Sequence, residues 1–146
     1  MTDEHKPIDI LLVEDSETDA QLTLEALAEG KIRNTVAHVP DGEEAMAYLR
    51  REGKYANATR PDLILLDLNM PKLDGRDVLK AIRSDEELRV IPVVVLTTSN
   101  QDRDVLESYG LAANNYIVKP VDLTQFFSVI QEVQEFWVTV VRLPPK

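Results

Sequence analysis

Cysteine is absent from the 146-residue chain, and its absence excludes disulfide frameworks, cysteine nucleophiles and thiolate metal sites. Basic residues are few: 16 Lys and Arg stand against 26 Asp and Glu, for a formal net charge of −10. An acidic surface repels nucleic-acid backbones and anionic lipids, so we expect neither DNA nor a membrane surface as a partner.

Long apolar runs are lacking as well. No run approaches the roughly 20 residues that a membrane-spanning helix needs, and the N-terminus, Met-Thr-Asp-Glu-His-Lys-Pro, has no signal-peptide pattern. We therefore expect a cytoplasmic protein. The composition, 44% apolar and 29% charged, is globular, and 146 residues suit one domain with its own core.

Short apolar runs alternate with longer helical stretches along the chain. Strands are expected over residues 8–13, 35–39, 62–67, 93–97 and 115–118, and helices over 16–29, 41–51, 74–84, 99–109 and 122–142. Ser16, Asp41 and Asp74 suit the capping position before a helix. Asp41 with Glu44 resembles a capping box, and Gly30 suits a helix end.

This alternation predicts an α/β, flavodoxin-like fold, a (βα)5 doubly wound parallel sheet of strand order 2-1-3-4-5 in a three-layer sandwich. The continuous apolar strands indicate a parallel sheet covered on both faces. No linker composition divides the chain, so we expect a single domain over 1–146. Its core would span about 8–135, and an extended C-terminal helix and tail about 136–146.

Polar side chains follow four of the expected strands at their carboxyl ends. They are Glu14 and Asp15 after the first strand, Asp67 on the third, Thr97 on the fourth and Lys119 after the fifth. Ligands of open α/β sheets bind beyond this edge. Three carboxylates there would repel one another, and their oxygens suit Mg²⁺ (or Mn²⁺). Asp67 could then attack a phosphoryl group whose oxygens Thr97 and Lys119 bind.

Each of these residues also has an ordinary explanation when it is taken alone. Asp67 could cap a helix, Glu14 and Asp15 could begin one, and Lys119 could be a solvated charge. A functional site is favoured because all of these side chains are predicted to lie at one edge of the sheet.

The stretches that carry these residues resemble the receiver domain of two-component response regulators. They are Ile10-Leu-Leu-Val-Glu-Asp15, Pro61 to Pro71 with Asp74-Gly75, Pro92 to Thr97, and Tyr116-Ile-Val-Lys-Pro120. The resemblance covers about residues 8–135. The resemblance implies that the chain accepts a phosphoryl group from a histidine kinase and is not a turnover enzyme.

The resemblance also implies roles for the acidic residues. Asp67 corresponds to the phosphoacceptor, and Glu14 and Asp15 to the acidic pair that holds Mg²⁺. Asn69 matches the position whose backbone carbonyl joins the metal ligands. Glu14 stands where the family more often has Asp.

The resemblance also implies roles for residues at the ends of the last two expected strands. Thr97 and Tyr116 correspond to the switch hydroxyl and aromatic residue, and Lys119 to the lysine that pairs with the phosphoryl group. The Lys119–Pro120 peptide bond corresponds to one that is usually cis. Output would pass through protein contacts on the face formed by residues 99–109, 115–118 and the last helix.

A narrower set of motifs is similar to single-domain regulators of bacterial, cyanobacterial-type phytochrome histidine kinases. It includes Gly53-Lys54-Tyr55, Ser108-Tyr109 and the tail Phe136-Trp137-Val138 with Leu143-Pro144-Pro145. This implies a phytochrome as the kinase. A phosphorelay intermediate that serves another histidine kinase is the alternative.

The expected last helix carries more apolar surface than one core-facing stripe needs. Phe127, Phe136, Trp137 and Val141 are candidates for the seam of a homodimer, since aromatic residues are favoured in interfaces. Core packing is the alternative explanation for Trp137.

Two other functions fit the expected fold less well. A flavodoxin-like electron carrier needs a glycine-rich phosphate loop, but residues 14–19 contain four acids and no glycine. An aspartyl phosphatase generally carries a second Asp where Asn69 stands. His5 and His38 are interpreted as ordinary surface or strand residues, because zinc needs three or four converging ligands.

Overall fold

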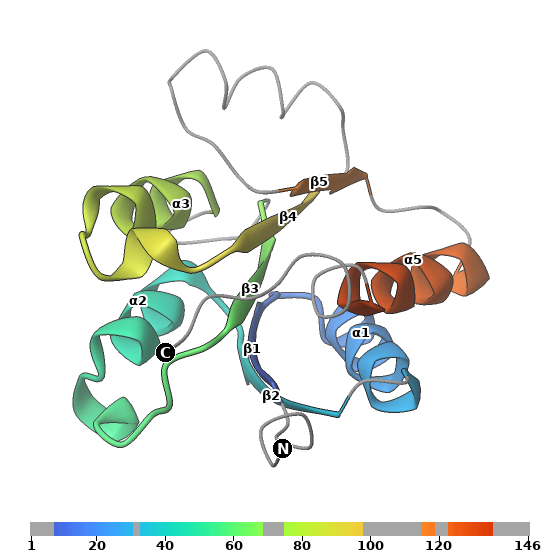
Figure 1. Cartoon of the computed structure of the whole chain (residues 1–146), viewed down its shortest axis with the longest axis horizontal. Coiled ribbons are helices and arrows are strands. Elements are labelled where there is room, and N and C mark those ends of the chain that lie inside the picture. The colour runs from blue at the N-terminus through green and yellow to red at the C-terminus, as the bar shows by residue number, and fades with distance from the viewer. Residues whose placement is uncertain (1–7, 31–32, 69–74, 98–114, 119–122, 136–146) are drawn as a thin grey trace, which may run out of the picture.

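The computed structural model describes residues 8–30, 33–68, 75–97, 115–118 and 123–135 (Figure 1). At residues 97, 115–118, 123, 126 and 133–135 the description is confined to the backbone. The helix expected over 99–109, the cap at Asp74 and the last helix beyond residue 135 lie outside these ranges. None of the helices within them combines the length and apolar character needed to cross a bilayer.

Five parallel strands form the predicted sheet, in the predicted order β2-β1-β3-β4-β5. Their bounds are β1 Ile8–Val13, β2 Asn34–Val39, β3 Leu63–Asp67, β4 Val93–Thr97 and β5 Asn115–Val118. The bounds differ from the predicted ones only at the starts of β2 and β3, by one residue each.

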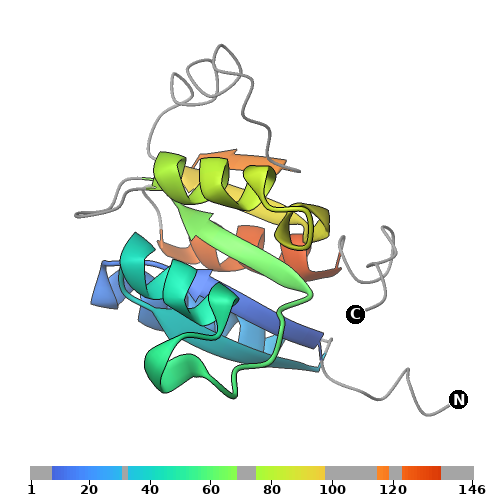
Figure 2. The same ribbon diagram turned by 90° about the vertical axis from the view of Figure 1, so that its left-hand side faces the viewer.

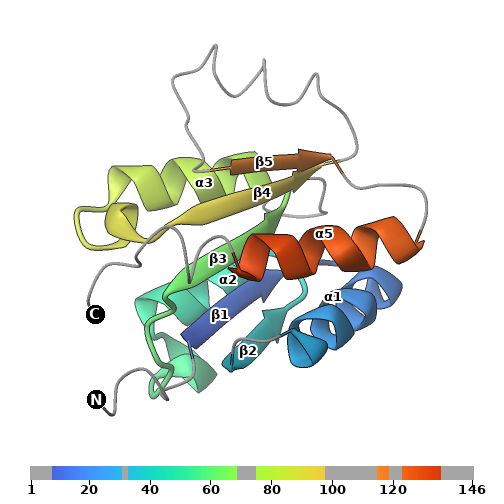
Figure 3. The same ribbon diagram turned by 45° about the vertical axis from the view of Figure 1, so that its right-hand side comes forward.

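Helices cover both faces of this sheet and complete the predicted three-layer sandwich. They are α1 Glu17–Glu29, α2 Gly42–Arg50, α3 Gly75–Ser84 and α5 Leu123–Glu135. Figure 2 shows α2 and α3 in front of the sheet, and Figure 3 shows α1 and α5 on the opposite face. Within the described ranges, two 3₁₀ turns, η2 Gly53–Tyr55 and η3 Leu88–Val90, were not predicted, because three residues are too few to show a periodic pattern.

The predicted caps at two helix starts are confirmed. The Ser16 hydroxyl accepts the N–H of Asp19 at 3.2 Å, and the Asp41 carboxylate accepts the N–H of Glu44 at 2.9 Å. Each side-chain oxygen supplies an acceptor for one of the backbone N–H groups that a helix start leaves without an intrahelical partner. Gly30 ends α1, as predicted.

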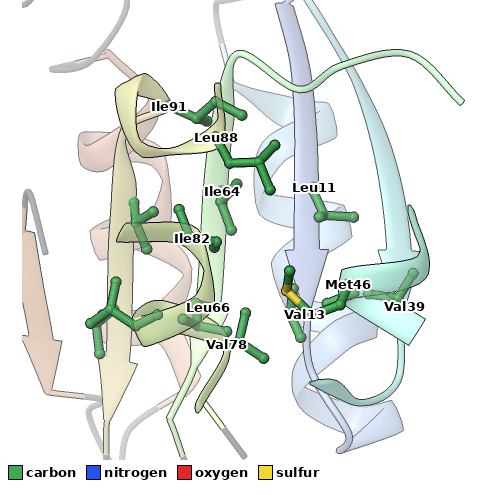
Figure 4. Close-up of a cluster of buried hydrophobic side chains, with 14 of the residues drawn as sticks. Leu11, Val13, Val39, Met46, Ile64, Leu66, Val78, Ile82, Leu88 and Ile91 are labelled. Carbon is green, nitrogen blue, oxygen red and sulfur yellow. The ribbon is translucent and has the colours of Figure 1, made fainter. Parts of the chain in front are cut away.

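The central strands alternate their side chains between two buried cores. On β3, Ile64 and Leu66 join the core beneath α2 and α3, whereas Leu63 and Leu65 join the core beneath α1 and α5. Figure 4 shows the first of these cores, in which Met46 of α2 lies near Val13 of β1. Burial on both faces explains the continuous apolar runs of the sequence.

Helix α5 packs on α1 over the second core. Ile130 is completely buried there, and the Gln131 side-chain amide donates to the Ala26 carbonyl at 3.3 Å. Phe127 is partly buried and packs against the same core. This contact corrects the expectation that Phe127 lies outside the core-facing stripe, since its ring reaches the core at the edge of that stripe.

Candidate functional site

The predicted acidic cluster forms where β1 and β3 end. These strands are adjacent and parallel, with Val13 in register with Leu66, so Glu14 and Asp67 leave the sheet side by side. One carboxylate oxygen each of Glu14, Asp15 and Asp67 lies within 4.8 Å of the others. Among the described residues, no other group of three His, Asp or Glu side chains meets that spacing.

Burying carboxylates of this cluster costs free energy on folding. Glu14 is 1% exposed and Asp67 is 3% exposed, whereas Asp15 is open to solvent. Buried carboxylates need compensation by a hydrogen bond or an opposite charge. Glu14 accepts the N–H of Ser16 at 3.3 Å, which compensates part of its desolvation. An all-oxygen donor set of this kind fits a hard divalent cation such as Mg²⁺ or Mn²⁺.

The backbone of Glu14 is tied to the end of β2. Its N–H donates to the Val39 carbonyl at 3.1 Å, and its carbonyl lies 2.8 Å from His38 Nε2. From its sequence context His38 was interpreted as an ordinary surface or strand residue, so this contact was not predicted. The predicted placement of β2 beside β1 was the signal that could have found it.

Asp67 is positioned by its neighbours along the chain and by α3. The N–H of Leu68 donates to the Leu96 carbonyl at 2.9 Å, and the N–H of Gly75 donates to the Leu68 carbonyl at 3.1 Å. A Cβ atom on Gly75 would lie only 2.5 Å from the Asp67 carbonyl oxygen and 2.5 Å from Leu68 Cα. Only glycine therefore lets α3 approach the strand end that carries Asp67.

The two predicted switch residues, Thr97 and Tyr116, lie on described backbone. Thr97 is the last residue of β4 and is in register with Val118, and Tyr116 is in register with Val95. Thr97 thus lies at the same edge of the sheet as Asp67, as predicted. The remaining predicted site and seam residues lie outside the described ranges: Asn69, Lys119, Pro120, Phe136, Trp137 and Val141.

Residues 10–131 match the model of the response regulator receiver domain. The chain belongs to this family, and its parallel five-stranded sheet with acids at the carboxyl ends of β1 and β3 agrees with that assignment.

Comparison with individual relatives shows which members of the family the chain resembles. The chain is 47% identical to response regulator Rcp1 of Synechocystis sp. over 145 residues, which is 99% of each chain. It is similar to the crystal structure of the phosphorylated cyanobacterial phytochrome response regulator RcpA, with a TM-score of 0.89, 52% identity and coverage of 96% of this chain and 100% of that one. The Mn²⁺-bound form of Rcp1 gives a TM-score of 0.88 at 47% identity, over 95% of this chain and all of the other.

Proposed function

We propose that this receiver domain accepts a phosphoryl group from a histidine kinase on Asp67, in a Mg²⁺-dependent reaction. The observation that carries the proposal is the convergence of Glu14, Asp15 and Asp67 within 4.8 Å at the ends of two neighbouring strands. Three crowded carboxylates, two of them buried, serve no evident packing purpose, but they suit a site that binds a cation and a phosphoryl group.

The chemistry assigns separate tasks to the three acids. An Asp67 carboxylate oxygen attacks phosphorus, the bond between phosphorus and the kinase histidine nitrogen breaks, and that nitrogen keeps the electron pair. Glu14, Asp15 and Asp67, with the Asn69 carbonyl, would hold the cation. When bound, Mg²⁺ offsets the charge of the carboxylates and of the phosphoryl oxygens. The chain modifies its own aspartate and is therefore not a turnover enzyme.

The proposed switch involves β4 and β5. Thr97 and Lys119 would bind phosphoryl oxygens, and Tyr116 would turn inward as Thr97 moves. This change would alter the face formed by residues 99–109, β5 and α5. The register of β4 with β5 supports the assignment, because it brings Thr97 and the end of β5 to one edge. The Lys119–Pro120 bond, cis by resemblance, would aim the lysine.

The proposed partner is a phytochrome histidine kinase. Support comes from the similarity to Rcp1 and RcpA, at 47% and 52% identity over nearly the whole chain. The net charge of −10 supports protein rather than DNA as the target of the output, and we propose a cytoplasmic location. We further propose that residues 1–146 form a single receiver domain.

A homodimer seam on the last helix completes the proposal. It would use Phe127, Phe136, Trp137 and Val141. The large aromatic residues concentrated in this stretch support such a surface. Phe127 can contribute only the part of its ring that the core leaves exposed.

Replacement of the acceptor tests this function directly. Purified wild type, Asp67→Asn and Asp77→Asn would be incubated with acetyl phosphate, a small phosphodonor, with and without Mg²⁺. We expect acid-labile labelling of wild type that requires Mg²⁺ and is lost in Asp67→Asn. Asp77 is an exposed acid of α3 outside the cluster, so Asp77→Asn should be labelled like wild type. Undiminished labelling of Asp67→Asn would contradict the proposal.

The kinase assignment needs a second comparison. Phosphotransfer from a phytochrome histidine kinase should be faster than transfer from unrelated histidine kinases at equal concentrations. If unrelated kinases transfer as fast, the phytochrome assignment fails while the acceptor assignment stands.

A further inference from the structure

Both backbone polar groups of Glu14 are held by the last two residues of β2. The N–H of Glu14 donates to the Val39 carbonyl at 3.1 Å, which continues the ladder between the two strands. The carbonyl of Glu14 lies 2.8 Å from His38 Nε2. A carbonyl oxygen can only accept, so Nε2 carries the hydrogen of this bond.

The position of that carbonyl matters for the acidic cluster. It belongs to the peptide unit that joins Glu14 to Asp15, and a peptide unit is planar. A bond that fixes the carbonyl oxygen therefore also fixes the direction in which the chain enters Asp15. Asp15 is the one member of the cluster that is exposed, so burial does not fix its side chain as it does those of Glu14 and Asp67.

The His38 side chain contributes little to the packing of the fold. It lies on β2, an edge strand of the sheet, and its side chain is exposed. Its ring adds little to either buried core. The bond to Glu14 links two residues that are 24 positions apart in the sequence and joins the edge strand to the loop that carries two of the three acids.

We propose that His38 is a positioning residue, which holds the peptide unit between Glu14 and Asp15 so that their carboxylates are ready for a divalent cation. The inference rests on the proposed function, because it takes this cluster to be a cation site. His38 contacts neither the cation nor the phosphoryl group in this account. It acts through the Glu14 carbonyl, as groups behind metal ligands commonly do.

Paired substitutions separate this role from general stability. His38→Ala removes the donor, whereas the side-chain amide of His38→Gln can still donate to the Glu14 carbonyl. Thr35→Ala is the matched control, since Thr35 is another exposed side chain of β2. Isothermal titration calorimetry would give the Mg²⁺ dissociation constant of each full-length protein. Labelling by acetyl phosphate across a Mg²⁺ series would give the half-saturating concentration and the maximal rate.

We expect loss of the His38 donor to weaken Mg²⁺ binding without lowering the maximal rate of phosphorylation. His38→Ala should weaken Mg²⁺ binding about three- to tenfold, which is the range expected for one net hydrogen bond. The labelling rate at saturating Mg²⁺ should stay near that of wild type, and the unfolding temperature without Mg²⁺ should fall by no more than the few degrees that one net hydrogen bond contributes. His38→Gln should recover most of the affinity, and Thr35→Ala should not change it.

Two results would overturn the inference while leaving the proposed function intact: equal Mg²⁺ affinity in His38→Ala and wild type, or equal weakening in His38→Gln and His38→Ala. A wild type that binds Mg²⁺ but is not labelled would overturn the proposed function alone. A wild type that does not bind Mg²⁺ would overturn both.

Discussion

Gly75 lets α3 pack against the strand end that carries Asp67, the proposed acceptor. Helix α3 begins at this residue and touches the backbone of Asp67 and Leu68, where a Cβ atom would come within 2.5 Å of two backbone atoms. Backbone atoms cannot move aside as the end of a flexible side chain can. Any side chain at this position must therefore displace either α3 or the end of β3.

Gly75→Ala should for this reason be destabilising and should also impair phosphorylation. We expect a loss of about 3 kcal/mol of unfolding free energy from overpacking, measured by urea denaturation. Gly53→Ala is a matched control: its φ is +57° but no atom lies within 4 Å of the added Cβ, so only backbone strain of about 1 kcal/mol applies. Equal losses in the two variants, or normal labelling of Gly75→Ala, would contradict this explanation.

Single residues differed in how readily the sequence revealed their roles. Ser16 and Asp41 were predicted as caps because a cap acts on residues two or three positions away. Glu14, Asp15 and Asp67 were predicted to meet because strand ends and strand order suffice to bring them together. His38 was missed because its bond depends on the register of β2 against β1, which composition and periodicity do not specify.

At the scale of elements, α2 and η2 are joined by a small polar and aromatic cluster. Glu44 of α2 accepts a hydrogen bond from the Tyr55 hydroxyl and pairs with Lys54 at 3.2 Å. The Tyr55 ring meets the Tyr48 ring edge-on, with 5.3 Å between centroids. Glu44 was predicted as the second half of a capping box, and the structure shows that its carboxylate also holds the turn that follows α2.

Tyr55→Phe should change how stability depends on alkaline pH. Burial, followed by the hydrogen bond to Glu44, raises the pKa of Tyr55 above its ordinary value. A raised pKa means that the folded state holds the proton more tightly, so this contribution is complete below about pH 10 and is lost as the pH rises further. Tyr55→Phe should lose about 1 kcal/mol at neutral pH, and its stability should decline less above pH 10 than that of wild type.

Urea denaturation at a series of pH values measures this effect. Glu44→Gln is the control, because it removes the charge but keeps the partly buried Tyr55 hydroxyl, whose desolvation is the largest cause of the raised pKa. Its alkaline decline should therefore persist. Parallel stability curves for wild type and Tyr55→Phe above pH 10 would show that Tyr55 does not titrate as described.

At the scale of the whole molecule, the proposed homodimer gives the clearest prediction. A two-fold interface uses each residue twice, so Trp137→Ala should remove two contacts at once. We expect self-association to weaken by at least about tenfold, as for an aromatic hot spot, measured by sedimentation velocity across a concentration series. Val90→Ala is the control, since Val90 of η3 is 54% exposed and lies outside the proposed seam. An unchanged sedimentation profile of Trp137→Ala would count against the dimer.

The topology of the whole chain was predictable for a physical reason. Continuous apolar runs such as Leu63–Leu66 can be buried on both faces only in a sheet that helices cover on both sides, and parallel strands require crossover connections. The two 3₁₀ turns and the entry of Phe127 into the second core were not predictable in this way. They depend on how particular side chains fill the space between layers, which periodicity does not describe.

The separation of β1 and β3 in the sequence has a thermodynamic consequence. The chain places α1, β2 and α2 between Glu14 and Asp67, so an unfolded polypeptide does not keep the carboxylate oxygens of the cluster within 4.8 Å of one another. A cation that needs all three carboxylates recognises the native state alone, and mass action then shifts the folding equilibrium towards that state. Above the dissociation constant, each tenfold rise in free cation adds about 1.4 kcal/mol to the unfolding free energy. The free concentration of the divalent cation would thereby set both how readily the domain is phosphorylated and how large its unfolding free energy is.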